Sequence, residues 1–129
     1  MKSVVITGVS SGIGYGVARE FIKQGYRIFG SVRKKEDADR LCNEFGESYI
    51  PIIFDLTDHK AIYDAANYVA SCLNNEGLSG LINNAGTAES GPAMYMPVDL
   101  FQKHIDIMVT GNLVVMQAFL PLLGAYKNC

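Results

Sequence analysis

The chain has 129 residues, enough for one domain with its own core and too few for two. Its apolar content of 49% argues against disorder, and its net charge of −2 argues against nucleic-acid binding. The three cysteines are too few and too widely spaced for a disulfide framework or a zinc site, which is usual in a reducing compartment. The longest apolar stretch, 113–125, is interrupted by Gln117, Pro121 and Gly124 and predicts no membrane span. We therefore expect a cytoplasmic protein without a metal site.

Short apolar runs alternate with helical patterns along the whole chain. Four runs are predicted to be strands: 3–7, 26–32, 49–54 and 78–83. The segments that follow them carry apolar residues at helical spacing: 13–24, 35–45, 58–77 and 100–125. This alternation predicts β-α-β units and therefore a doubly wound, parallel, Rossmann-like α/β sheet in one domain over 1–129. The last helix is apolar almost all round, so we expect it to be buried on more than one side.

A glycine-rich loop stands where the first strand passes into the first helix. Its sequence is Thr-Gly-Val-Ser-Ser-Gly-Ile-Gly over 7–14, which matches neither G-x-G-x-x-G nor the P-loop pattern. Glycines at such a turn let the backbone approach a pyrophosphate, and the helix N-terminus offers it N–H groups and a favourable dipole. The loop therefore predicts a nucleotide-binding site at the start of the first helix.

The same loop also fits a rival function. Residues 8–12 read G-x-S-x-G, the nucleophile elbow of serine hydrolases, and Ser10, Asp55 or Asp58, and His104 follow in the hydrolase chain order. Against this, an elbow normally follows several earlier strands, and Gly14 has no role in that scheme. A serine hydrolase that uses Ser10 remains the alternative from another class.

Two further motifs follow strand ends. Asp55-Leu56 comes after the third predicted strand, and Asn83-Asn84-Ala85-Gly86 comes after the fourth. Together with the T-G-x-x-x-G-x-G loop, in this order and spacing, they resemble the classical short-chain dehydrogenase/reductase family over the whole chain. The resemblance implies an NAD(P)-dependent oxidoreductase that interconverts a small-molecule carbonyl and alcohol by hydride transfer. It implies that Gly8, Ser10, Ile13 and Gly14 line the pyrophosphate, with Ser11 and Gly12 in the same cofactor-binding loop. It also implies that Asp55 and Leu56 contact the adenine. Asn83, Ala85 and Gly86 would flank the riboses, with Asn83 also bracing the central strands.

Cofactor choice depends on the end of the second strand. NAD-selective sites place an acidic residue there, which hydrogen-bonds the ribose 2′-hydroxyl. This chain has Val32 at that position, followed by Arg33, Lys34 and Lys35. With no carboxylate to repel a 2′-phosphate and with cations to attract one, the sequence favours NADP(H), bound in part by Arg33; NAD(H) is the alternative.

The resemblance also implies a catalytic serine and a Tyr-x-x-x-Lys pair after a fifth strand. This chain reaches Cys129 in or after the helix before that strand, and Tyr126 and Lys127 are adjacent rather than four residues apart. We therefore expect the sheet to be truncated after its fourth strand and following helix, and the chain to bind cofactor without turnover.

Met108 occupies the position where family members usually carry a water-binding asparagine, and Gly111 aligns with the glycine that follows it. A catalytically inactive NADP-binding sensor or partner module is therefore a second alternative. The family packs its long helix against a counterpart in another subunit, so we also expect a homo-oligomer through 100–125.

Overall fold

The computed structural model describes residues 1–87 and 91–124. Its centre is a parallel sheet with the strand order β3-β2-β1-β4. The strands are β1 (Ser3–Ile6), β2 (Arg27–Val32), β3 (Tyr49–Ile53) and β4 (Gly80–Ile82). The predicted doubly wound α/β fold is confirmed. The fourth strand is shorter than predicted, because Leu78 forms only an isolated bridge with Leu123 before the ladder begins at Gly80.

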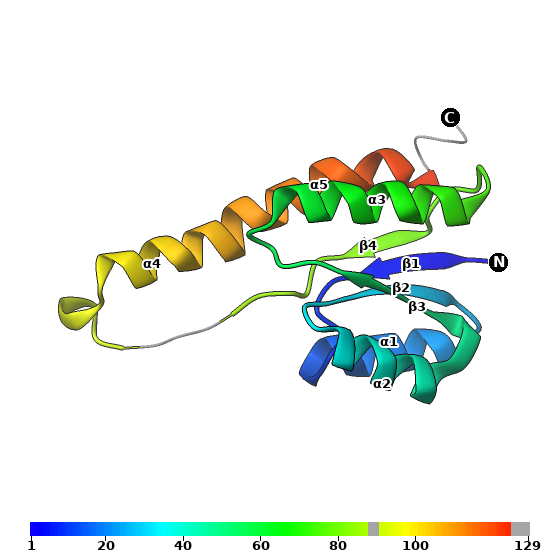
Figure 1. Cartoon of the computed structure of the whole chain (residues 1–129), viewed down its shortest axis with the longest axis horizontal. Coiled ribbons are helices and arrows are strands. Elements are labelled where there is room, and N and C mark those ends of the chain that lie inside the picture. Colours follow the sequence, from blue (N-terminus) through cyan, green and yellow to red (C-terminus); the bar gives the residue numbers. More distant parts are fainter. Residues whose placement is uncertain (88–90, 125–129) are drawn as a thin grey trace.

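Helices cover both faces of the sheet (Figure 1). α1 (Gly12–Lys23) and α2 (Lys35–Phe45) lie on one face, and α3 (His59–Leu73) and α5 (Asn112–Phe119) lie on the other. Successive strand residues point to opposite faces, so each face has its own core. Val5 and Phe29 pack under α3 and α5, whereas Val4 and Ile28 pack under α1 and α2. Because helices cover both faces, residues that point to either side of the sheet are buried, which explains the unbroken apolar runs in the strands.

The last helical segment differs from its prediction. It runs from Val98 to Leu122 as α4 (Val98–Ile105), a π-helical turn (Asp106–Gly111), α5 and a 3₁₀ turn (Leu120–Leu122). α5 packs against α3 and buries four of its apolar residues, Val114, Val115, Ala118 and Phe119. In α4, by contrast, Val98 is 79% exposed and Phe101 56% exposed. The expectation of burial on several sides is therefore wrong for α4, because α4 extends beyond the end of the sheet (Figure 1).

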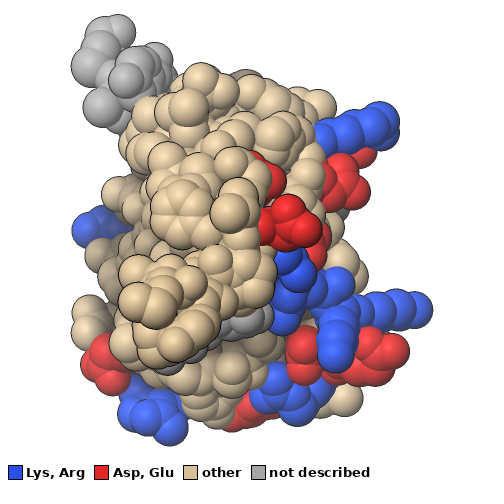
Figure 2. All heavy atoms as spheres, turned by 90° about the vertical axis from the view of Figure 1, so that its left-hand side faces the viewer, with Lys and Arg blue, Asp and Glu red and all other residues tan. Residues whose placement is uncertain are grey.

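The helical segment from Val98 to Leu122 is strongly apolar. Over its 25 residues it is long and apolar enough to cross a membrane, a test that core helices of water-soluble proteins also pass. On the face at the end from which α4 projects, uncharged residues cover most of the surface. Charged side chains of both signs lie mainly toward one side of this face, with a few elsewhere along its edge (Figure 2). Ala125 and the Tyr126-Lys127 pair lie outside the described residues.

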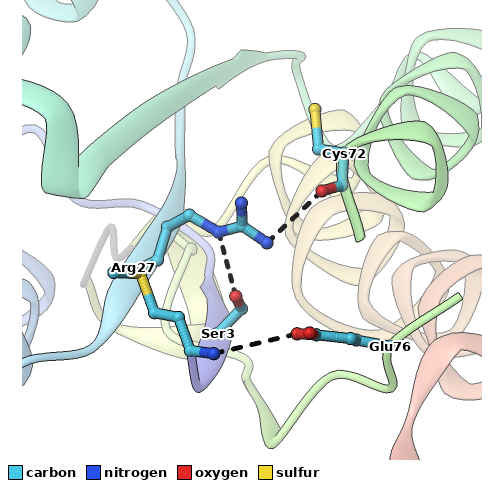
Figure 3. Close-up of polar contacts among 5 residues, drawn as sticks. Ser3, Arg27, Cys72 and Glu76 are labelled. Carbon is cyan, nitrogen blue, oxygen red and sulfur yellow. Dashed lines mark hydrogen bonds and ion pairs between the residues drawn. The ribbon is translucent and has the colours of Figure 1, made fainter. Parts of the chain in front are cut away.

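One arginine ties three elements together at the amino ends of the strands (Figure 3). The Arg27 guanidinium donates through Nε to Ser3 Oγ at 3.0 Å and through Nη2 to the Cys72 carbonyl at 3.4 Å. It also lies 5.0 Å from the centre of the Phe29 ring. The nearby ion pair between the Met1 ammonium and Glu76 is exposed, so it contributes little to stability.

Arg27→Met keeps most of the aliphatic stem but removes both hydrogen bonds and leaves the buried Ser3 hydroxyl without its donor. We expect it to lower the free energy of unfolding by about 1–3 kcal/mol. Urea unfolding followed by circular dichroism measures this. The exposed Lys23→Ala is the control and should stay within about 0.5 kcal/mol of wild type; equal stability of the two variants would contradict the role of Arg27.

Candidate functional site

A cleft of about 330 Å³ opens at the carboxyl ends of the strands. The glycine loop, the passage from β2 into α2, the end of β3 and the end of β4 form its walls. Its lining residues are Gly8, Ser10, Ser11, Ser31, Val32, Arg33, Lys34, Asp37, Phe54, Asp55, Leu56, Asn84, Ala85, Gly86, Thr87 and Ile107. Ligands of open α/β sheets bind at this edge, where the strand order reverses between β1 and β4.

Most of the residues predicted from the sequence meet in this cleft. Those that line it are Gly8, Ser10, Ser11, Arg33, Asp55, Leu56, Ala85 and Gly86. Four predicted residues do not line it: Gly12, Ile13, Gly14 and Asn83. Ile13 is 79% exposed, so its side chain contributes no wall. A contact of these four residues with a cofactor stays a prediction.

The glycine loop has the shape that a pyrophosphate requires. Gly8 and Gly12 adopt positive φ angles of +73° and +63°, a conformation that favours glycine. A Cβ on Gly14 would overlap the Gly8 carbonyl, so only glycine lets α1 start this close to the strand end. Ser11, the N-cap of α1, makes no capping hydrogen bond with its side chain. Its hydroxyl and the helix N-terminus therefore suit an anion at the cleft wall.

A buried hydroxyl joins this loop to the turn after β4. Thr7 Oγ1 accepts hydrogen bonds from the backbone N–H groups of Asn84 and Ala85, both at 2.9 Å. The Asn84 side chain donates to the Gly8 carbonyl at 2.9 Å, whereas Asn83 is exposed. The residue that braces the central strands is thus Asn84, not Asn83 as expected. The motif places two asparagines side by side, and only the direction of the chain after Ile82 decides which one turns inward.

Asp55 is held as a carboxylate on the opposite wall. The backbone N–H of Thr57 donates to its Oδ1 at 2.9 Å, and the Thr57 hydroxyl donates to the same oxygen at 2.8 Å. These two hydrogen bonds, the backbone one first, keep the pKa of Asp55 below its ordinary value, and the charge of Arg33 lowers it further. Leu56 is buried beside it and provides an apolar surface.

The passage from β2 into α2 contains a carboxylate that the sequence prediction missed. Val32 is buried at the strand end, and Arg33 and Lys34 line the cleft as expected. Asp37 also lines it, so the expectation that no carboxylate is available there is wrong. The reason is that α2 begins at Lys35, only two residues after the strand ends, and Asp37 lies in its first turn, which faces the cleft.

Met108 lies in the π-helical turn and packs on the turn after β4. Its Sδ accepts a hydrogen bond from the Thr87 backbone N–H at 3.3 Å, and a Cβ on Gly86 would lie 3.0 Å from its Cε. The Asn112 side chain donates to the Met108 carbonyl at 2.6 Å. Within the described residues, His104 Nε2 and Asn112 Oδ1 are buried without a hydrogen-bond partner.

The hydrolase triad does not assemble in the part of the chain that the structure describes. Asp58 accepts from the backbone N–H of Ala61 and caps α3, and Asp55 is engaged by Thr57. His104 is not among the residues that line the cleft with Ser10. No hydrogen bond joins Ser10, either aspartate and His104 among the described residues.

The parallel sheet, the glycine loop at the start of α1 and the cleft at the β1/β4 switch point define a dinucleotide-binding α/β protein. The family model of the short chain dehydrogenases matches residues 2–128, and the chain belongs to this family of oxidoreductases. The resemblance inferred from the three motifs is therefore confirmed.

Relatives and solved structures agree with this assignment. The chain is 38% identical, over 99% of its length, to an NADPH-dependent 3-dehydrocapnine reductase of Ornithobacterium rhinotracheale, of which it covers 45%. It is 33% identical over 95% of its length to mouse retinol dehydrogenase 16, of which it covers 39%. An NADPH-bound carbonyl reductase from chicken fatty liver superposes with a TM-score of 0.86 at 25% identity, over 95% of this chain and 48% of that one. The chain thus spans about half the length of these proteins or less.

The two asparagines after β4 offer a matched test of the brace. Asn84→Ala removes the donor to the Gly8 carbonyl, so we expect it to lower the free energy of unfolding by about 1–2 kcal/mol. Asn83→Ala changes an exposed side chain and should cost less than about 0.5 kcal/mol. Urea unfolding of both variants gives the comparison, and a larger loss in Asn83→Ala would refute the assignment.

Proposed function

We propose that the chain is the cofactor-binding part of an NADP(H)-linked dehydrogenase/reductase that interconverts a small-molecule carbonyl and alcohol. The observation that carries the proposal is the cleft itself. The glycine loop and the N-terminus of α1 form one wall, and Arg33 and Lys34 follow the buried Val32 on the next. The NADPH-dependent reductase and the NADPH-bound carbonyl reductase among the similar proteins support the choice of NADP(H).

Each wall has a distinct task in this proposal. Ser10, Ser11 and the glycine loop bind the pyrophosphate, while Asp55 and Leu56 hold the adenine edge. Asn83, Ala85 and Gly86 flank the riboses, and Arg33 pairs with the 2′-phosphate. The nicotinamide, when bound, supplies or accepts the hydride. Thr7 and Asn84 keep the two loops at the spacing that these contacts need.

The acid–base groups belong to the part of the family's length that these 129 residues do not span. In this proposal the tyrosine of a Tyr-x-x-x-Lys pair from that part exchanges a proton with the substrate oxygen, the lysine lowers the pKa of that tyrosine, and a serine polarises the oxygen. Met108 brings a thioether, not an amide, to the wall beside Gly86. This is the observation that favours the second candidate, an NADP-binding sensor without turnover, and turnover by a complete protein would rule the sensor out.

Direct titration tests cofactor binding. Quenching of protein fluorescence by NADPH and NADH should give a lower Kd for NADPH. Arg33→Ala should weaken NADPH by about tenfold and leave NADH within twofold, because only NADPH carries the phosphate that Arg33 pairs with. Gly14→Val should abolish binding of both, because its side chain would overlap the Gly8 carbonyl. The exposed Lys23→Ala is the control.

Two results would contradict this proposal. Failure of the wild-type chain to bind either dinucleotide would remove its basis, and a preference for NADH would overturn the choice of NADP(H). Labelling of Ser10 by a fluorophosphonate probe would instead support the hydrolase.

The exposed apolar residues of the last helix support self-association, which is also part of the proposal. Phe101 is 56% exposed, Val109 59% and Leu113 50%, and large exposed apolar patches usually mark interfaces. We expect oligomers at micromolar concentration in sedimentation velocity and a shift toward monomer in Phe101→Glu/Val109→Glu. Tyr63→Glu, on the exposed side of α3, is the control. A monomeric wild type would contradict this expectation.

A further inference from the structure

Two charged side chains of α2 lie near the end of β2, where a dinucleotide-binding cleft distinguishes a ribose 2′-hydroxyl from a 2′-phosphate. Asp37 lines the cleft beside Arg33 and Lys34, just beyond the end of β2. One turn further along α2, Arg40 places its Nη2 3.4 Å from Asp37 Oδ1. The same nitrogen donates to the Ser10 carbonyl of the glycine loop at 2.6 Å. Arg40 therefore joins two walls of the cleft and touches the one carboxylate that α2 contributes to its described lining.

The electrostatic consequence follows from what the two cofactors carry. In dinucleotide-binding sheets the ribose 2′ position lies at the end of the second strand, and an acidic residue there accepts a hydrogen bond from a 2′-hydroxyl. The same carboxylate repels a 2′-phosphate, which is a strong way of rejecting a ligand. A free Asp37 carboxylate would thus oppose the attraction that Arg33 and Lys34 exert on the 2′-phosphate.

We propose that Arg40 is a positioning residue for cofactor selection: it holds and neutralises Asp37, so that the cleft accepts an adenosine with a 2′-phosphate. This inference rests on the proposed function, because it assumes that the cleft binds a dinucleotide. A guanidinium has five N–H donors, so Arg40 can serve Asp37 and the Ser10 carbonyl at once. An exposed ion pair of this kind stabilises the fold little, so its effect falls on the ligand and not on folding.

Binding of two small probes separates the charge effect from a loop effect. Adenosine 2′,5′-bisphosphate carries the 2′-phosphate and adenosine 5′-monophosphate lacks it. Isothermal titration calorimetry would compare the wild-type chain with Arg40→Gln, Asp37→Asn and the double variant. We expect Arg40→Gln to weaken the bisphosphate by about five- to tenfold, as for unit charges several ångströms apart near a wet surface. The monophosphate should change by less than twofold.

The double variant is the decisive measurement. With Asp37→Asn present, Arg40→Gln should bind the bisphosphate within about twofold of wild type, because the Asp37 carboxylate that would repel the phosphate is gone. Glu36→Gln is a matched control on the same helical turn, exposed and outside the cleft lining, and it should change the ratio of the two affinities by less than twofold. Raising the salt to 0.5 M should shrink the difference between Arg40→Gln and wild type.

Three other results would overturn the inference in distinguishable ways. Equal weakening of both probes in Arg40→Gln, without rescue by Asp37→Asn, would mean that Arg40 acts only through the Ser10 carbonyl. Unchanged affinities would mean that the pair has no role in selection. If the wild-type chain binds neither probe, the proposed function itself fails. Thermal unfolding by circular dichroism verifies that each variant is folded.

Discussion

The edge of the sheet that forms the cleft depends on one buried hydroxyl group. Thr7 follows β1, is fully buried and accepts two backbone N–H groups from the turn after β4. Those N–H groups lie beyond the last ladder pair of β4, so without the hydroxyl they would be left unpaired in a half-buried place. The return bond from the Asn84 side chain to the Gly8 carbonyl makes the link reciprocal.

The link between Thr7 and the turn after β4 also explains why the loop needs glycine at positions 8 and 14. Because it draws the turn after β4 against the loop after β1, the Cα of Ala85 would lie 2.8 Å from a Cβ on Gly8. Position 14 has no room for a side chain either, because the Gly8 carbonyl of the same loop occupies the space that a Cβ would need. The close approach of backbone to backbone leaves the cleft wall free of side chains at the point where a pyrophosphate would lie. The two motifs that resemble the family are thus one structural unit.

Sequence patterns predicted this architecture well because it rests on local rules. Apolar runs, helical spacing and glycines at the first two helix ends gave the four strands, α1, α2 and α3, and the strand ends gave most of the cleft. The site predictions that were wrong concern residues whose side-chain orientation depends on the path of the backbone and not on the residue type. Whether Asn83 or Asn84 turns inward depends on the backbone after Ile82, and whether Asp37 reaches the cleft depends on where α2 begins. The sequence analysis did not predict the exposure of α4. An apolar pattern shows that a helix has residues suited to burial, but it does not show whether another element packs against them.

Met108 lies in a π-helical turn of the last helical segment, beside the turn after β4. A π-helical turn frees a backbone carbonyl from the regular ladder, and such turns are frequent at functional sites. Here the Asn112 amide, one turn beyond Met108, donates to the Met108 carbonyl. Gly111 has no room for a side chain, because a Cβ there would lie 2.8 Å from the Leu56 carbonyl. The side-chain amide in this turn is thus that of Asn112, and at position 108 a thioether contacts the Thr87 N–H. Gly111 thus lets this helix approach the segment after β3 closely, while the group that faces Gly86 is a thioether, which is only a weak hydrogen-bond acceptor.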